Sequence, residues 1–363
     1  MRKILIFNKT LKVGGAERQL LYVAKSLMKE KGVQVDFLLC TKTGELVKNV
    51  ELLGCRIDTI SVSGRWSTAR KLRQVIQREK YETVLTYLPE CNLLSELAAI
   101  PSRKWKVVVG ARSANPAFLK SWRLRIYYWA HLLADCVISN SKKNADDILS
   151  VNRLLSPHRI VVSYNIIEDQ SVLKYGCKSL DNHSNFITIV VAANYREVKN
   201  VVGLVKALVM LPKSALERIR IKWYGAVLDD SYQEANSFIL RNGLSPYISL
   251  CLPTDNVIQK YLEADVIGLF SHYEGFPNAI CEALSVGKMV ICTPVSDLPQ
   301  LLDSSGNIIC ASSSAEDIAQ GLEMLTTRSF AEIACLSELN KRIFEKYFNK
   351  SVIISQMRNI ILS

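Results

Sequence analysis

Short apolar runs of strand length alternate with longer segments of helical periodicity along most of the chain. This alternation is typical of parallel sheets that are covered by helices on both faces. Two sets of six strands predict two doubly wound α/β domains, each with a parallel sheet. The predicted strands are Lys3–Phe7, Val33–Cys40, Thr83–Thr86, Lys106–Gly110, Cys136–Ser139 and Arg159–Ser163 in the first half, and Thr188–Ala192, Arg220–Trp223, Ile248–Leu250, Val266–Phe270, Met289–Cys292 and Gly306–Cys310 in the second.

The two predicted domains are separated by a stretch with turn composition and no periodicity, from Glu168 to Asn185. We therefore expect an N-terminal domain over residues 1–168, a C-terminal domain over residues 169–345 and a last helical segment over residues 346–363. The length of 363 residues, about twice that of a typical domain, agrees with this division. Two such domains that face each other leave a cleft at the carboxyl ends of their strands, so function is expected in the loops that follow strands.

The composition adds a marked charge asymmetry. Hydrophobic residues make up 49% of the chain and charged residues 22%, which excludes the disordered and fibrous classes. The net charge is +12, but residues 1–170 hold 28 Lys and Arg against 15 Asp and Glu, whereas residues 171–363 hold 18 against 19. Because the first half carries all the excess, we expect it to face something anionic: a nucleic acid, a membrane surface or a phosphorylated acceptor.

Metal and redox chemistry find little support in the sequence. The ten cysteines form no Cys-x-x-Cys pair, the four histidines lack ligand spacing, and no Asp-x-Asp occurs, so we expect no metal site. Most cysteines lie in apolar segments, which is typical of reduced, buried thiols in a cytosolic protein. No apolar run approaches the ~18 residues of a membrane-spanning helix, and the N-terminal run is too brief for a signal peptide. The expected location is the cytoplasm.

The loop after the first predicted strand contains Gly14 and Gly15, and apolar residues at helical spacing follow. Glycines let backbone amides approach a ligand closely and a helix N-terminus favours an anion, so this loop predicts a phosphate or carboxylate site. A tight turn with positive φ would explain the same two glycines. The pattern is not Gly-x-Gly-x-x-Gly, so a dinucleotide-binding fingerprint is not supported.

The loop after the strand that ends at Phe270 is the most informative. It carries Glu274, and a helix predicted to start near Asn278 and to end at Gly287 carries Glu282 in its interior. The neighbours of Glu282 are almost all apolar, so we expect a largely buried helix whose one glutamate needs a partner. The two carboxylates suit hydrogen bonds from sugar or ribose hydroxyls. Backbone amides at the start of this helix add donors, from Gly275, Phe276 and Asn278.

Together these residues resemble a known family. Glu274-Gly275-Phe276-Pro277-Asn278, with Glu282 eight positions after Glu274, resembles the Glu-x7-Glu motif of the family 4 retaining glycosyltransferases, of the kind that act in bacterial polysaccharide synthesis. The resemblance covers most of the chain and implies the GT-B fold, in which two Rossmann-like domains face each other across a cleft. It implies that the N-terminal domain binds the acceptor and the C-terminal domain the nucleotide sugar, and that the last helix, within residues 346–363, crosses back to pack on the N-terminal domain. Four further segments resemble the family in the same order: Gly14-Gly15-Ala16-Glu17, Ala134–Ser141, Tyr164-Asn165 and the phosphate loop Val191–Asn200.

The resemblance also implies roles for single residues. Lys199 would lie on the diphosphate of a nucleotide-sugar donor, Glu274 would touch the donor hexose and Glu282 would hold the ribose hydroxyls. A lysine is a point charge that offsets a departing diphosphate, which agrees with the implied role of Lys199. The donor contacts from loops would come from Gly275, Phe276, Pro277, Asn278, Gly14 and Gly15.

The chain departs from the family pattern at three places. Asn194 stands where the family usually has arginine, five positions before the lysine, and we expect Arg196 to take that role. Arg112 and Ser113 follow the strand after which the family often has a histidine, so a histidine-dependent mechanism is not supported, and a retaining front-face transfer needs no protein nucleophile. Gln300 occupies the place of a family glutamate in the loop after Thr293.

An aromatic and basic segment predicts a helix over residues 116–133, opened by Asn115-Pro116. Its apolar stripe consists of Phe118, Trp122, Ile126, Trp129 and Leu133, and Lys120, Arg123 and Arg125 flank it. Such a mixture is typical of a membrane interface or of a polyprenyl-diphosphate acceptor site, but a core helix with solvated basic flanks fits equally well. The candidates for the acceptor or membrane side are Arg112, Ser113, Trp122, Arg123 and Arg125.

The expected function is the retaining transfer of a hexose or N-acetylhexosamine from a UDP- or GDP-linked donor to a saccharide acceptor, lipid-linked and at the inner face of a membrane. No cofactor or metal is expected, because Lys199, Arg196 and backbone amides would offset the charge of the diphosphate. Nothing resembles a nucleic-acid-binding motif, so nucleic acid is not expected as a partner. The alternatives are a sugar-nucleotide epimerase or phosphorylase of the same fold, or a non-enzymatic module that binds a nucleotide sugar or a nucleic acid.

Overall fold

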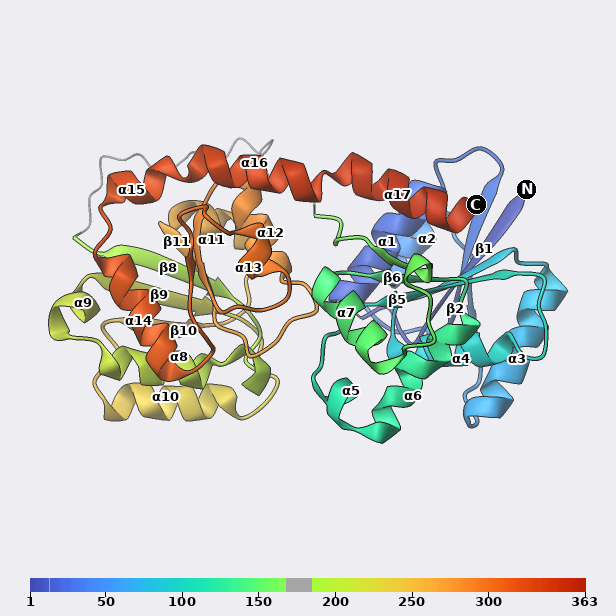
Figure 1. The fold of residues 1–363 in the computed structure, drawn as a ribbon, viewed down its shortest axis with the longest axis horizontal. Coiled ribbons are helices and arrows are strands. Elements are labelled where there is room, and N and C mark those ends of the chain that lie inside the picture. Colours follow the sequence, from blue (N-terminus) through green and yellow to red (C-terminus); the bar gives the residue numbers. More distant parts are fainter. Residues whose placement is uncertain (13, 168–184) are drawn as a thin grey trace. The chain divides into compact units, whose positions relative to one another are not determined.

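The computed structural model describes residues 1–12, 14–167 and 185–363, and it divides into two compact units (Figure 1). The first unit consists of Met1–Ile166 and Lys350–Ser363, and the second consists of Ile167–Asn349. Almost all of the stretch in which the sequence places the domain boundary, residues 168–184, lies outside the described residues. No helix in the described part of the chain is long and apolar enough to cross a membrane.

The first unit is built on a seven-stranded parallel sheet with the order β3-β2-β1-β4-β5-β6-β7. Six of these strands were predicted, and only β3 was missed, because a half-exposed edge strand of three residues leaves no apolar run. The strand order reverses between β1 and β4, and ligands of such sheets bind at the carboxyl ends beside the reversal. The strands are β1 (Arg2–Asn8), β2 (Val33–Leu39), β3 (Ile57–Thr59), β4 (Thr83–Thr86), β5 (Lys106–Ala111), β6 (Cys136–Ser139) and β7 (Ile160–Val162).

Helices pack on this sheet, and their apolar residues form two hydrophobic clusters with those of the strands. One cluster holds apolar residues of α3 (Arg65–Glu79), α4 (Pro89–Ala98), α6 (Trp122–Ala130) and α7 (Lys142–Val151), and the other holds residues of α1 (Gly15–Leu27), α2 (Val47–Leu52) and α17 (Lys350–Leu362). The last helix of the chain is therefore part of the first unit. Its buried residues are Ile353, Met357 and Ile361.

Polar contacts also hold α17 to the first unit. The Thr83 hydroxyl donates to the carbonyl of Ile361 over 3.1 Å, and the Lys106 ammonium donates to the carbonyl of Ile360 over 2.7 Å. Arg358 forms an ion pair with Glu30 at 2.5 Å. The carbonyls at the C-terminus of a helix need partners outside the helix, and β4 and β5 supply them here.

The helix expected over residues 116–133 is broken, so that expectation is wrong. α5 (Ala117–Lys120) is followed by Ser121, whose extended backbone, with φ −89° and ψ 118°, interrupts the helix before α6 begins. A 3-10 turn over His131–Leu133 follows. The break divides the expected stripe, because helical spacing does not continue through an extended residue. Phe118 stacks on the ring of Tyr128 at 5.4 Å, whereas Trp122 is 77% exposed.

The second unit is built on a six-stranded parallel sheet with the order β10-β9-β8-β11-β12-β13. All six strands were predicted, with bounds that differ by at most two residues. The order reverses between β8 and β11, which places the ligand-binding position of this sheet at the loops after these two strands. The strands are β8 (Ile187–Ala192), β9 (Ile219–Tyr224), β10 (Ile248–Cys251), β11 (Val266–Leu269), β12 (Met289–Cys292) and β13 (Ile308–Ile309).

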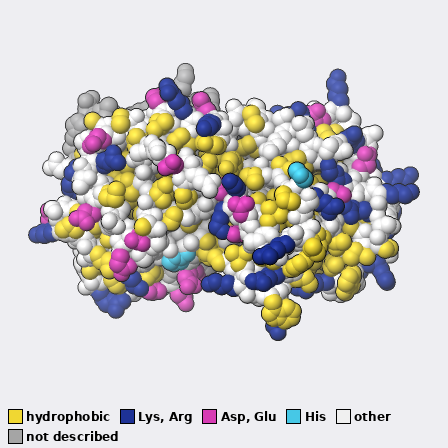
Figure 2. All heavy atoms as spheres, in the orientation of Figure 1, with side chains coloured by type: hydrophobic (Ala, Val, Ile, Leu, Met, Phe, Trp, Pro, Cys, Tyr) yellow, Lys and Arg dark blue, Asp and Glu magenta, His cyan; other side chains and the backbone are white. Residues whose placement is uncertain are grey.

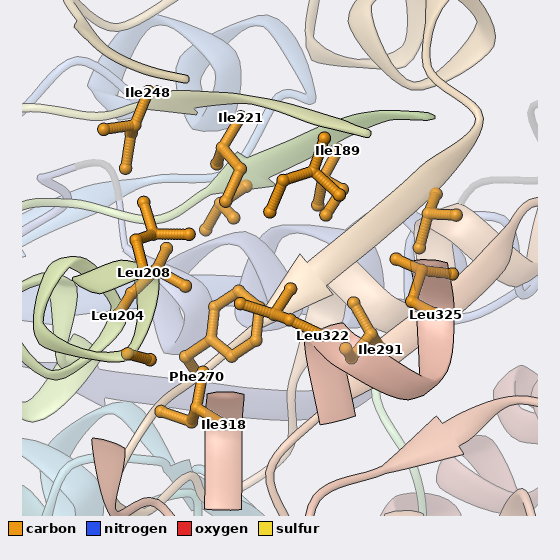
Figure 3. Close-up of a cluster of buried hydrophobic side chains, with 14 of the residues drawn as sticks. Ile189, Leu204, Leu208, Ile221, Ile248, Phe270, Ile291, Ile318, Leu322 and Leu325 are labelled. Carbon is orange, nitrogen blue, oxygen red and sulfur yellow. The ribbon is translucent and has the colours of Figure 1, made fainter. Parts of the chain in front are cut away.

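A single large cluster forms the core on one side of this sheet (Figure 3). Leu204 and Leu208 of α8 (Val201–Met210) and Ile318 and Leu322 of α14 (Ala315–Thr326) pack there around Phe270, and α10 (Ser231–Arg241) adds apolar residues. α12 (Asn278–Ser285) packs on both α11 (Val257–Glu263) and α16 (Ser337–Phe348). The short helices are α9 (Lys213–Glu217), α13 (Leu298–Leu301) and α15 (Phe330–Cys335).

Candidate active site

Two loops at the strand-order reversal of the second sheet bring Lys199 and Glu274 together. Lys199 ends a 3-10 turn after β8, and Glu274 lies in the loop after β11. Lys199 Nζ lies 2.5 Å from Glu274 Oε1, and Ser271 Oγ donates to the same oxygen over 2.7 Å. The two charged side chains are 25% and 13% exposed, so this is a mostly buried, charge-assisted contact at the edge of the sheet where ligands bind.

Asn200 explains why Lys199 reaches Glu274. Its backbone has φ +63° and ψ 37°, a left-handed conformation that asparagine tolerates better than most residues, and its side chain caps α8 by accepting from the amide of Gly203. Its amide group donates to the carbonyls of Phe270 over 3.1 Å and Ser313 over 2.9 Å. A single buried asparagine thus ties the loop after β8 to the loop after β11.

The loop that carries Glu274 is fixed from other sides as well. The amide of His272 donates to the carbonyl of Val198 over 2.9 Å, and the Thr293 hydroxyl donates to the carbonyl of Ser271 over 2.7 Å. Ser296 Oγ donates to the carbonyl of Gly275 over 2.8 Å. Every one of these bonds comes from a neighbouring strand-end loop, so the position of Glu274 is set by the sheet order.

The helix that follows begins at Asn278, and Gly287 ends it with φ +72°, as the sequence predicted. The helix is largely buried, as expected, and Glu282 lies in its interior on a half-buried face. The reason is the helical period: Asn278, Ala279, Glu282 and Val286 share a half-exposed face, while the residues between them are buried.

Tyr261 lies close to Glu282 and was missed by the sequence analysis. Burial, and then the charge of Glu282, raise the pKa of its hydroxyl well above the ordinary value. The hydroxyl is buried and has no hydrogen-bond partner among the described residues. A lone tyrosine in a short amphipathic helix gives no signal in the sequence, because core tyrosines occur in the same pattern.

The phosphate loop holds Arg196 apart from the Lys199–Glu274 contact. Arg196 is exposed, and its side chain makes no hydrogen bond or ion pair within the described ranges. Asn194, at the position of the family arginine, accepts from the amide of Ala226 over 3.1 Å. Gly225 is also required here, since a Cβ atom at that position would lie 2.1 Å from the carbonyl oxygen of Ala193.

The glycine loop of the first unit is not a positive-φ turn. Gly14 has φ −153° and ψ 166°, which is extended backbone open to any residue, and α1 begins at Gly15. A tight turn with positive φ therefore does not explain the two glycines. The exposed N-terminus of α1 is the remaining reason to expect an anion at this loop. Gln19 in the first turns of α1 donates to and accepts from the backbone of Ile166 over 2.8 and 2.6 Å.

Arg112 lies at the carboxyl edge of the first sheet, and no carboxylate of the described residues pairs with it. Its Nη1 donates to Asn165 Oδ1 over 2.9 Å, and its guanidinium carbon lies 4.1 Å from the centre of the Tyr87 ring. Both Arg112 Nε and the Tyr87 hydroxyl are buried and lack a hydrogen-bond partner in the described part of the chain. Ser113 is the exposed residue after Arg112. A guanidinium with unused donors is suited to bind a phosphate or carboxylate.

Metal ligands do not gather anywhere in the described ranges, where no group of three or more His, Cys, Asp or Glu side chains is arranged to hold an ion. The nine described cysteines are free thiols. Phe276 is buried and packs on Phe348 at 5.4 Å, so its ring supports the loop. Its amide and those of Gly275 and Asn278 lie where α12 begins.

Two protein families match the chain over adjoining ranges. The family described as Glycosyltransferase Family 4 matches residues 13–171, and the family described as Glycosyl transferases group 1 matches residues 178–341. The two matches thus cover every strand of the two sheets except β1.

Two curated relatives come from Campylobacter jejuni. The chain is 26% identical over 298 residues, 78% of this chain and 77% of the relative, to GalNAc-α-(1→4)-GalNAc-α-(1→3)-diNAcBac-PP-undecaprenol α-1,4-N-acetyl-D-galactosaminyltransferase. It is 25% identical over 316 residues, 81% of each protein, to N-acetylgalactosamine-N,N'-diacetylbacillosaminyl-diphospho-undecaprenol 4-α-N-acetylgalactosaminyltransferase. The solved structure of Anabaena Alr3699/HepE in complex with UDP shares the fold with a TM-score of 0.82, 17% identity and 99% coverage of both chains.

Proposed function

We propose that this chain, which belongs to the family 4 glycosyltransferases with two Rossmann-like domains, transfers a sugar with retention from a nucleotide-sugar donor to a lipid-linked saccharide. The observation that carries the proposal is the Lys199–Glu274 contact at the strand-order reversal of the second sheet. The proposed donor is a UDP- or GDP-linked N-acetylhexosamine or hexose. The names of the two Campylobacter relatives support an N-acetylhexosamine as the transferred sugar and an undecaprenyl-diphosphate-linked acceptor.

The donor contacts follow from the hydrogen-bonding groups of the site that have no partner among the described residues. Lys199 uses one of its three donors on Glu274, so the others can bind the diphosphate. Oε1 of Glu274 accepts from Lys199 and Ser271, whereas Oε2 makes no hydrogen bond in the described ranges and can accept from a hexose hydroxyl. Glu282, on the half-exposed face of α12, would accept from the ribose hydroxyls.

The reaction then needs no protein nucleophile. The bond between the anomeric carbon and the diphosphate oxygen breaks, and the acceptor hydroxyl forms its bond on the same face of the sugar. The hydroxyl proton passes to the departing phosphate oxygen. Lys199, Arg196 and the amides at the start of α12 offset the charge that develops on the diphosphate, without a metal ion.

Arg112 is the proposed contact for the acceptor. Its guanidinium has a buried Nε with no hydrogen-bond partner and no carboxylate partner among the described residues, which fits a diphosphate, and it lies at the carboxyl edge of the first sheet. Ser113 is exposed beside it. An acceptor of this chemistry is anchored in a membrane, so the enzyme would act at the inner membrane face from the cytoplasm.

Glu282→Ala is expected to weaken the affinity for the nucleotide about 10- to 150-fold, because a charged hydrogen-bond acceptor contributes about 1.5–3 kcal/mol. Titration calorimetry with UDP and GDP measures the affinity. Glu263→Ala is the matched control, since Glu263 is an exposed acid at the end of neighbouring α11. An unchanged affinity in a folded Glu282→Ala protein would remove this residue from the donor site.

A panel of nucleotide sugars tests the proposal. One donor should raise the melting temperature, because a ligand at 100 times its Kd stabilises the native state by about 2.7 kcal/mol. The same donor should release its nucleotide only when a lipid-linked saccharide is added. Conversion of the sugar without release would identify an epimerase, and stabilisation without any turnover would identify a binding module, and each result would overturn the proposal.

A further inference from the structure

Helix α6 exposes most of its side chains to solvent. Among its nine residues only Tyr128 is buried, while Trp122 is 77% exposed, Ile126 46% and Trp129 41%. These three side chains are spaced at i, i+4 and i+7, which places them on one side of the helix. Together with Arg65 they line a shallow groove of about 760 Å³.

The start of α3 extends this surface. Arg65 Nη2 lies 3.5 Å from the hydroxyl of Tyr127 in α6, and the next residue, Trp66, is 68% exposed. The other two of the five tryptophans, Trp105 and Trp223, are buried. All three exposed tryptophans therefore lie on or beside one groove. We use the name α6 surface for the following residues: Arg65, Trp66, Trp122, Arg123, Ile126 and Trp129.

The α6 surface is basic and has no acid in its segments. Residues 59–78 contain five Lys and Arg, residues 111–134 contain four, and neither range contains Asp or Glu. Neither Arg65 nor Arg123 forms an ion pair within the described ranges. Figure 2 shows hydrophobic side chains next to lysines and arginines over α5 and α6. Large exposed apolar side chains among unpaired cations mark a surface that a partner covers.

We propose that the α6 surface docks on an anionic phospholipid membrane. Tryptophan favours the boundary between headgroups and acyl chains, and arginines are attracted to anionic headgroups. A surface of this kind would bring the enzyme to its lipid-linked acceptor. The purpose of docking therefore rests on the proposed function, whereas membrane binding itself can be tested without any sugar transfer.

Other occupants fit the surface less well. In a two-fold contact with a second copy, the arginines of one copy would face those of the other with no carboxylate between them. A single-stranded nucleic acid would stack on tryptophans and pair with arginines, but it offers nothing apolar to Ile126, whereas acyl chains do.

Vesicle flotation of the full chain tests the proposal. We expect binding to vesicles of phosphatidylcholine and phosphatidylglycerol, weak binding to phosphatidylcholine alone and loss of binding as salt rises. Brominated acyl chains should quench the tryptophan fluorescence, because only tryptophans of the α6 surface are exposed. Equal binding to neutral and anionic vesicles, absence of quenching, or displacement by an oligonucleotide would overturn the proposal.

Substitutions localise the contact. Trp122→Ser with Ile126→Ser should lower vesicle affinity about tenfold or more, and Arg123→Gln should weaken binding to anionic vesicles alone. Leu154→Ser is the matched control, since Leu154 is 73% exposed in the same unit and outside the surface. Circular dichroism and the melting temperature verify folding. Wild-type affinity in the folded double variant, or an equal loss in the control, would contradict the assignment.

A transfer assay in detergent separates this proposal from the proposed function. Vesicle binding by a protein that transfers no sugar would contradict the function and support the docking surface. Sugar transfer in detergent by a protein that does not bind vesicles would support the function and overturn the docking surface.

Discussion

Lys199→Ala is expected to lower kcat about 100- to 1,000-fold, the usual cost of removing one group that stabilises developing charge in a transition state. The loss falls on kcat because the diphosphate gains charge as it departs. The variant also leaves the mostly buried Glu274 carboxylate with Ser271 as its remaining partner. Steady-state kinetics with saturating acceptor measure the effect.

Two further variants sharpen this prediction. Arg196→Ala should lower kcat less, because Arg196 is exposed and makes no contact with the Lys199–Glu274 pair. Lys206→Ala is the control, since Lys206 is an exposed lysine of α8 that lies 4.0 Å from Glu234. If Lys199→Ala turned over like the wild type, lysine would have no part in the mechanism.

Deletion of residues 352–363 should destabilise the first unit, although these residues come from the opposite end of the chain. It removes Ile353, Met357 and Ile361 from the cluster that they share with α1 and β1. At about 1.5–3 kcal/mol for each large apolar side chain the loss is about 4.5–9 kcal/mol, comparable with the whole stability of a domain. Hydrogen exchange should increase over residues 1–166 and stay low over residues 185–345.

Point substitutions in α17 give a milder form of this test. Met357→Ala should cost about 2–5 kcal/mol, whereas Asn359→Ala, exposed on the same helix, should cost little. Increased exchange confined to residues 185–345 would show that α17 does not stabilise the first unit.

The strands could be predicted because parallel strands buried on both faces are continuous apolar runs. β6 (Cys136–Ser139) and β12 (Met289–Cys292) were predicted with the bounds that the structure has. The two failures have local causes. β3 is too short to show an apolar pattern. The extended backbone of Ser121 ends a helix at a point where the apolar periodicity of the sequence predicts that the helix continues. Backbone geometry at a single serine is not encoded in hydrophobic spacing.

The site was predicted in part. The sequence placed Lys199 and Glu274 in loops after strands, but their contact depends on the sheet order, which brings β8 and β11 together across 75 positions of the chain. The tie that Asn200 makes, and the close approach that requires Gly225, follow from the same order. A single asparagine or glycine gives no long-range signal, so these supports were missed.

The central claim is a retaining transfer from a nucleotide sugar, and the anomeric configuration of the product tests it most directly. The chain would be incubated with the donor selected from the panel and an undecaprenyl-diphosphate-linked saccharide, and NMR would give the configuration of the new linkage. Our account predicts one nucleotide released for each sugar transferred and an α linkage formed from an α-linked donor. A β linkage from that donor, or no product with any pair of donor and acceptor, would contradict it.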